Sequence, residues 1–240
     1  MDTAKKNIYR RVMLKLSGEA LMGKKDYGIS VEVIEDIARD IMALLSRKIQ
    51  IGIVIGAGNF FRGARLNGTK ISRVAGDHLG MVATMLNALA MQDVFIRLKI
   101  PTKIMSALPI DGLIERYDYR KAEKSLQKGY VMIFAGGIGN PLVTTDTALC
   151  LRGIELNADL LLKATNVDGV YANDPKKNPK TKFFSHLTYD EALKKELAVM
   201  DLTAFCLGRD HKMKLRIFNI FKKGALLRII QGEDVGTLVE

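Results

Sequence analysis

The chain has 240 residues, of which 48% are hydrophobic and 26% are charged. This length gives one large domain or two small ones, and the composition excludes disordered and fibrous proteins. No uninterrupted apolar run reaches the roughly 18 residues of a membrane span. Lys15 and Glu19 also break the apolar stretch near the N-terminus too early for a signal peptide. We therefore predict a cytoplasmic protein.

Lysine and arginine outnumber aspartate and glutamate by 37 to 26, which gives a net charge of +11. Such an excess attracts polyanions, either nucleic acid or small phosphorylated metabolites. The basic residues are scattered among apolar ones, so a solvated surface explains them equally well. The two cysteines and three histidines show no metal-ligand spacing. We expect Cys150 to be a small buried side chain and no stand-alone metal site.

Short apolar strands alternate with longer helices along the chain. In chain order we expect strand 8–16, helix 30–45 capped by Ser30, strand 49–55, helix 72–98, strand 102–106, helix 119–127, strand 130–135, helix 144–156, strand 159–164 and a hairpin turn at 167–170. This alternation, without a repeat or a long linker, predicts one α/β unit with a mainly parallel sheet. Met81, Met85 and Met91 on the longest helix suit either a subunit interface or the core.

Glycines follow three of the expected strands. They are Gly18, the pair Gly56 and Gly58, and the group Gly136, Gly137 and Gly139. The carboxyl ends of parallel strands meet at one edge of a sheet, where ligands bind. Glycine lets backbone N–H groups approach phosphate oxygens closely, and a helix N-terminus just beyond favours the negative charge. We therefore expect a ligand with more than one phosphate group at this edge.

Two lysines, Lys15 and Lys163, interrupt otherwise apolar strands near the same edge. A lysine in a buried strand is costly unless an anion meets it, although an edge strand could point one of them to water. Thr144 and Thr145 stand at a helix start, where hydroxyl groups can bind phosphate. Asp146 follows them and could orient a lysine or a metal ion.

Two familiar nucleotide-binding motifs match only in part. Segment 18–25 approximates a P-loop, but Lys25 stands where Ser or Thr would bind Mg²⁺. Segment 56–61 begins like a dinucleotide fingerprint, but Phe61 replaces the third glycine. Both departures argue against a P-loop kinase and a Rossmann dehydrogenase.

Six ordered motifs resemble those of the bacterial uridylate kinases, a branch of the amino acid kinase family. They are the segments 15–20, 56–63, 76–78, 139–146, 163–171 and 174–175, and the likeness runs from about residue 9 to 239. The resemblance implies an αβα sandwich with a central, mostly parallel sheet in a single domain over 1–240. It places the phosphate acceptor in the half at about 1–150 and ATP in the half at about 151–240.

The resemblance also implies a role for each matching residue. The catalytic residues would be Lys15, Gly18, Lys163, Asp146 and Asp201. ATP would contact Lys15, Leu16, Ser17, Gly18, Gly58, Arg62, Thr165, Asn166, Tyr171 and Asp174. UMP would contact Ala57, Asp77, Ile138, Gly139, Asn140, Pro141, Leu142, Val143, Thr144 and Thr145.

On this resemblance the protein would phosphorylate UMP to UDP by in-line transfer from MgATP, in pyrimidine nucleotide synthesis. The acceptor phosphate is already ionised, so no general base is required. Mg²⁺ would arrive with ATP rather than occupy a protein metal site. The resemblance further implies a homohexamer, inhibition by UTP and, as in some relatives, activation by GTP.

Three other interpretations stay open at this point. A kinase of a carboxylate acceptor, similar to acetylglutamate kinase, would share Lys15 and the glycine loops but would need no ribose or base pocket. A nucleic-acid-binding regulator would explain the net charge of +11 and would bind less tightly as salt rises. A nucleotide sensor would bind ATP and UMP without turnover.

Overall fold

The computed structural model describes residues 7–61, 70–197 and 199–240. A nine-stranded sheet lies at its centre, with the strand order β4-β3-β5-β2-β1-β6-β10-β11-β9. In chain order its strands are β1 (Arg11–Leu16), β2 (Gln50–Ile55), β3 (Thr102–Ser106), β4 (Glu115–Arg116), β5 (Val131–Ala135), β6 (Leu160–Thr165), β9 (His186–Leu187), β10 (Leu215–Asn219) and β11 (Thr237–Val239). Neighbouring strands run parallel except for β10 and β11. The predicted α/β class with a mostly parallel sheet is therefore confirmed.

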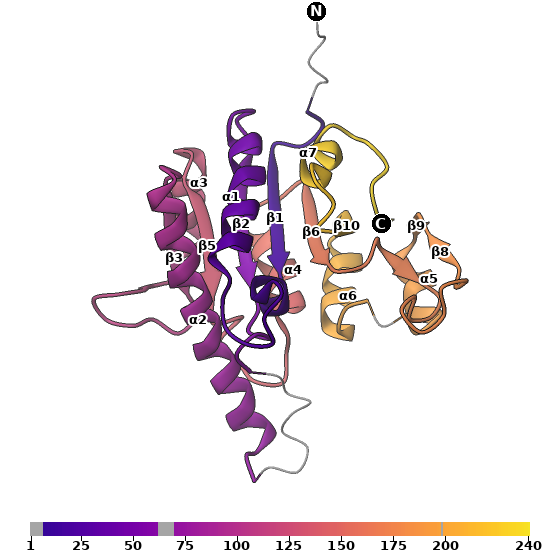
Figure 1. The fold of residues 1–240 in the computed structure, drawn as a ribbon, viewed down its shortest axis with the longest axis horizontal. Helices are drawn as coiled ribbons and strands as arrows, with labels where there is room; N and C mark the ends of the chain where they lie inside the picture. Colours follow the sequence, from indigo (N-terminus) through magenta and orange to yellow (C-terminus); the bar gives the residue numbers. More distant parts are fainter. Residues whose placement is uncertain (1–6, 62–69, 198) are drawn as a thin grey trace, which may run out of the picture.

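Helices cover both faces of this sheet (Figure 1). They are α1 (Val31–Leu45), α2 (Arg73–Arg97), α3 (Tyr119–Gln127), α4 (Thr145–Glu155), α5 (Tyr189–Lys194), α6 (Leu202–Asp210) and α7 (Ala225–Ile230), with a short 3₁₀ helix η1 (Gly18–Met22) after β1. Side chains of α1, α2 and α7 pack into one hydrophobic cluster, and those of α3, α4, α5 and α6 into a second. The two clusters lie on opposite faces of the sheet, which makes the expected αβα sandwich.

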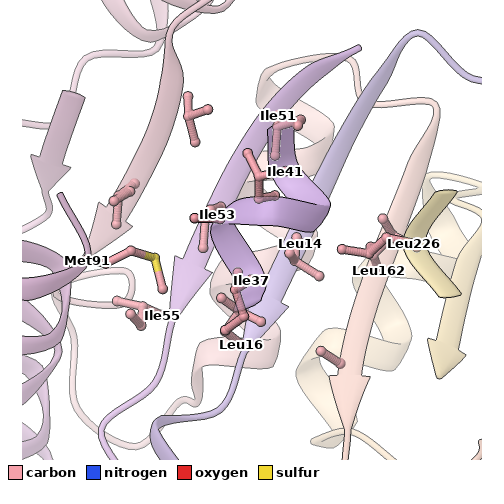
Figure 2. Close-up of a cluster of buried hydrophobic side chains, with 14 of the residues drawn as sticks. Leu14, Leu16, Ile37, Ile41, Ile51, Ile53, Ile55, Met91, Leu162 and Leu226 are labelled. Atoms are coloured by element: carbon pink, nitrogen blue, oxygen red, sulfur yellow. The ribbon is translucent and has the colours of Figure 1, made fainter. Parts of the chain in front are cut away.

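The alternation of side chains along β1 decides which residues reach which layer. Leu14 and Leu16 belong to the cluster beneath α1, where Figure 2 shows them near Ile37 and Ile41. Each such side chain contributes about 1.5–3 kcal/mol on full burial. Lys15 lies between these leucines in the sequence, so its side chain emerges on the other face, the one covered by α4.

Helix α2 is long and apolar enough to cross a membrane by length and composition. Half of its most apolar window is buried inside the protein, as expected for a core helix. Met81, Met85 and Met91 are all buried, and Met85 and Met91 belong to the hydrophobic cluster beneath α1 and α2. Ser72 caps the N-terminus by accepting a hydrogen bond from the backbone N–H of Ala75 at 3.2 Å.

Two sequence expectations need correction in the fold. The first strand begins at Arg11 rather than Ile8, because the N–H groups of Arg10 and Arg11 donate to the Asp159 carboxylate instead of a neighbouring strand. The prediction of a hairpin turn at 167–170 is wrong. Strand β7 (Val170–Tyr171) pairs with β8 (Phe183–Phe184) in a separate two-stranded sheet.

Candidate functional site

One carboxylate joins the two lysines of the central strands. Lys15 on β1 and Lys163 on β6 are direct neighbours across the parallel pair, so both ammonium groups emerge side by side on the α4 face. Asp146, in the first turn of α4, lies between them. Its Oδ1 is 3.1 Å from Lys15 Nζ and its Oδ2 is 2.5 Å from Lys163 Nζ. We call this arrangement the Lys–Asp–Lys triad.

Burial sets the electrostatics of the triad. The side chains of Lys15, Asp146 and Lys163 are only 12%, 10% and 13% exposed. Burial alone would raise the pKa of Asp146, but the two lysines outweigh it and hold that pKa below its ordinary value. Burial lowers the pKa of Lys163, and Asp146 opposes this effect. Lys163 also donates a hydrogen bond to the Val199 carbonyl, which stabilises its charged form.

A second aspartate fixes the helix that carries the triad carboxylate. Asp201 caps α6 by accepting a hydrogen bond from the Ala204 N–H at 3.0 Å. It also accepts hydrogen bonds from the hydroxyls of Thr144, the N-cap of α4, and Thr147. Among the described residues, the ion pairs of the two triad lysines go to Asp146. Asp201 therefore holds the start of α4 by hydrogen bonds, and its charge adds only the weakest of the effects that act on the pKa of Lys163, opposing the effect of burial.

The glycine loops after β1 and β2 are in direct contact. A side chain at Gly18 would place its Cβ 2.5 Å from the Gly58 N and 2.4 Å from Asn59 Oδ1, closer than any side chain tolerates. Ser17 accepts a hydrogen bond from the Ala20 N–H and caps η1. This short 3₁₀ turn occupies the start of the segment that approximates a P-loop, which agrees with the sequence argument against that motif.

A cavity of about 330 Å³ lies beside the start of α4. Of the predicted UMP contacts, those that line it are Ala57, Asp77, Ile138, Asn140, Val143, Thr144 and Thr145. Gly139, Pro141 and Leu142 belong to the same loop without lining it. The Asp77 carboxylate accepts a hydrogen bond from the Leu142 N–H at 2.8 Å and pairs with Arg73 at 3.0 Å. Asp77 thereby ties α2 to this loop.

A second cavity, of about 470 Å³, adjoins the triad at Lys163. Of the predicted ATP contacts, those that line it are Thr165, Tyr171 and Asp174, together with Lys163 of the triad. Asn166 lies in the same turn without lining the cavity. Thr144 and Thr145 line the first cavity and directly precede Asp146, while Lys163 lines the second. The triad therefore connects the two cavities.

Sequence reasoning missed several residues of both cavities. In the first they are Arg73, Gly80, Met81 and Thr84, and in the second Ala172, Asn173, Lys195, Glu196, Leu197, Val199 and Ile217. Thr84 follows Asp77 by two helical turns, so helical spacing could have found it. Its hydroxyl accepts a hydrogen bond from the Gly136 N–H at 2.7 Å. The other predicted ATP contacts among the described residues line neither cavity: Lys15, Leu16, Ser17, Gly18 and Gly58. Leu16 is fully buried in the core. Arg62 lies outside the described residues.

No group of three potential metal-ligating side chains gathers within residues 7–61, 70–197 and 199–240. Cys150 is fully buried, as expected from the sequence, and burial raises the pKa of its thiol to about 12. A thiol in that state is neutral at physiological pH and is neither a nucleophile nor a ready metal ligand.

Comparisons with known proteins agree with this architecture. The amino acid kinase family matches residues 10–219. A uridylate kinase of Coxiella burnetii is 56% identical over 240 residues, which cover all of this chain and 99% of that protein. The crystal structure of a UMP kinase from Bacillus anthracis superimposes with a TM-score of 0.93 at 37% identity, covering 97% of this chain and 96% of that one.

A UMP kinase structure from Ureaplasma parvum gives a TM-score of 0.90 at 33% identity and covers 96% of this chain and 98% of that one. The resemblance recognised in the six motifs is thus confirmed over nearly the whole length. This chain belongs to the amino acid kinase family, and the relatives that it matches over nearly their full length are the uridylate kinases of that family.

Proposed function

We propose that this enzyme transfers the γ-phosphoryl group of ATP to the phosphate of UMP, giving UDP for pyrimidine nucleotide synthesis in the cytoplasm. The observation that carries the proposal is the buried Lys–Asp–Lys triad between two cavities. The relatives that match over nearly the full length are uridylate and UMP kinases, which supports the choice of UMP as acceptor.

The triad suits phosphoryl transfer through electrostatics and position. The transition state of this reaction spreads negative charge over the transferred group, and catalysis comes mainly from placing cations around it. Lys15 and Lys163 supply two ammonium groups, and Asp146 holds both in place. The backbone N–H of Gly18 adds a third donor. The acceptor phosphate attacks in its ionised form, so the residues need only orient it.

We assign the two cavities to the two substrates. UMP occupies the cavity beside α4, where Asp77 faces the ribose hydroxyls and the loop at 138–145 surrounds the phosphate and base. ATP occupies the cavity at Thr165, Tyr171 and Asp174, with Asn166 beside it. Leu16, Ser17, Gly18 and Gly58 lie near the transferring phosphates. The acceptor half at about 1–150 and the ATP half at about 151–240 follow from this assignment.

Mg²⁺ enters with ATP in this proposal. Protein-bound Mg²⁺ is commonly held by substrate phosphates and only one or two carboxylates. Asp146, within the triad, already pairs with both lysines. Asp201 already accepts hydrogen bonds from Thr144 and Thr147. The residues present therefore fit a metal carried by the nucleotide, which would neutralise part of the phosphate charge.

Assembly and regulation extend the proposal to a homohexamer that is inhibited by UTP, with GTP as a candidate activator. Leu79, Val82 and Leu86 form an exposed apolar stripe on α2, being 45%, 51% and 49% exposed. Their spacing places them along one side of the helix, as expected of a surface covered by another subunit.

The first test is an ADP-release assay with MgATP and four acceptors: UMP, CMP, dUMP and N-acetylglutamate. We expect turnover with UMP well above the others and its near abolition in Lys15→Ala. Turnover with N-acetylglutamate alone would assign the protein to the carboxylate kinases. ATP binding without turnover on any acceptor would make it a sensor. Salt-sensitive nucleic-acid binding that is indifferent to Lys15→Ala would favour a regulator.

A further inference from the structure

Two buried asparagines form a reciprocal amide pair behind the glycine loops. Asn59 follows the loop after β2, and Asn87 lies on α2; they are 2% and 0% exposed. The Nδ2 of each donates to the Oδ1 of the other at 2.8 Å. Neither residue belongs to a contact predicted for ATP or UMP.

The remaining amide hydrogens of the pair hold two backbone carbonyls. Asn59 Nδ2 donates to the Gly28 carbonyl at 3.0 Å, and Asn87 Nδ2 donates to the Gly56 carbonyl at 2.8 Å. The Gly28 N–H returns a hydrogen bond to the Asn59 carbonyl at 3.2 Å. Each Nδ2 thus has two acceptors, and flipping either amide would put an oxygen against two carbonyl oxygens.

The pair also touches the loop after β1. Asn59 Oδ1 lies 2.4 Å from the position that a Gly18 Cβ would take, so this side chain packs directly on the Gly18 backbone. Tyr27 contacts Phe60 edge to face, with ring centroids 5.4 Å apart. The amide pair therefore lies where α2, the loop ending at Gly28 and the glycine loops after β1 and β2 meet.

We propose that Asn59 and Asn87 are positioning residues that fix the two glycine loops for phosphoryl transfer. The inference rests on the proposed function, because it takes these loops as the ones beside the transferring phosphates. Loops of glycine do not hold themselves in one conformation, since glycine is the most permissive residue. The buried amides supply the missing constraint from behind, at atoms that never touch substrate.

The most informative variants are Asn59→Asp and Asn87→Asp, which keep the shape and replace donors with acceptors. At pH 8.5 the new buried carboxylate faces a backbone carbonyl oxygen and the Oδ1 of the other asparagine. Misplacement of catalytic groups by about 1 Å costs roughly 100-fold in rate. We expect kcat to fall by about that factor, while KM for UMP changes much less.

Acidification gives a second readout, which supports a positioning role when the melting temperature shows that the variant is folded at every pH used. Burial raises the pKa of such a carboxyl, so lowering the pH from 8.5 to 5.5 favours its protonated form. The neutral acid regains a donor and an acceptor. The ratio of variant to original kcat should therefore rise as the pH falls in this range.

Gln92→Glu is the matched control, because Gln92 lies on the same helix and donates to the Thr102 carbonyl at 3.3 Å, at the opposite edge of the sheet. It should lower the melting temperature without the loss in kcat or the recovery in acid. The inference is overturned if both aspartate variants keep kcat within about twofold. It also fails if their loss matches Gln92→Glu at equal melting temperature.

The shift in melting temperature on adding MgATP separates this inference from the proposed function. It should shrink in the asparagine variants but not in Gln92→Glu. If the unmodified enzyme shows that shift but transfers no phosphoryl group to UMP, the proposed function fails. The shift in melting temperature of the two asparagine variants then tests by itself whether the amide pair positions the glycine loops. An undiminished shift in both variants would then count against that positioning role.

Discussion

At the scale of single residues, the charge balance of the triad explains its chemistry. Two buried ammonium groups share one carboxylate, so the triad itself carries one positive charge in a region where charge is costly, and Asp201 offsets it only weakly at Lys163. An incoming phosphate relieves that cost. The same residues that destabilise the empty protein therefore attract its anionic substrates.

Replacing Asp146 with Asn should damage both activity and stability. Lys15 and Lys163 are register neighbours, and without the carboxylate their charges would face each other. Breaking a buried ion pair by removing one partner costs about 3–5 kcal/mol. Urea unfolding measures the stability and the ADP-release assay the activity. Asp93→Asn, in an exposed pair with Arg97, is the control and should change neither.

The lowered pKa of Asp146 predicts how stability depends on pH. The folded protein binds a proton at this carboxylate less readily than the unfolded chain does. The contribution of Asp146 is therefore fully present above the unfolded value of about 3.9 and is lost as pH falls through the lower folded value. Unfolding free energies measured from pH 6 to pH 3 should fall with a steeper slope than in Asp146→Asn. Equal slopes would contradict the ion pairs.

At the scale of elements, the capped helices could be predicted from the sequence, whereas the shortest strands could not. Ser30 and Ser72 cap α1 and α2 as expected, and the predicted helices end within about one or two residues of the observed ones. The strands β7 and β8 have two residues each, too short for any period, so the sequence gives no signal for them. The hairpin at 167–170 failed because its N–H at Val170 donates to Thr237, distant in the chain.

The site was predictable in part for a related reason. A charged residue inside an apolar strand, such as Lys15 or Lys163, is visible in the sequence because burial makes it costly. In the sequence, nothing distinguishes Asn59 and Asn87 from other polar residues, and only the fold brings their amides together. The Val199 carbonyl that accepts from Lys163 carries no sequence signal at all.

Substitutions at Asp201 should separate its capping role from its charge. Asn caps a helix about as well as Asp, whereas loss of a cap to Ala costs about 0.5–2 kcal/mol. We therefore expect Asp201→Ala to destabilise the protein by that amount and Asp201→Asn to retain most of the stability. Thermal unfolding measures both. Thr188→Ala removes the cap of α5, which is remote from α4, and its loss of stability provides the reference value for losing a cap. Equal losses in both Asp201 variants would show that the charge, not the cap, is what matters.

At the scale of the whole molecule, two cavities joined by one triad predict separable substrate effects. Tyr171→Ala removes an aromatic ring from the larger cavity, and stacking on a base is worth about 1–3 kcal/mol. It should raise KM for ATP about tenfold or more and leave KM for UMP nearly unchanged. Asp77→Ala should do the opposite, since this residue lines the other cavity. Steady-state kinetics with each substrate varied in turn measures both, and parallel changes would argue against separate sites.

The ends of the central sheet limit how copies of the protein can meet. Its outermost strands, β4 and β9, have two residues each, and Glu115 and Arg116 make up the first. Edge strands this short, one of them made of two charged residues, give a neighbouring chain almost nothing to pair with. Growth of the sheet from one molecule into the next is therefore blocked at both sides. Subunits that assemble must therefore meet through helices and loops, and within its described residues the folded sheet presents no long edge strand from which a fibril could extend.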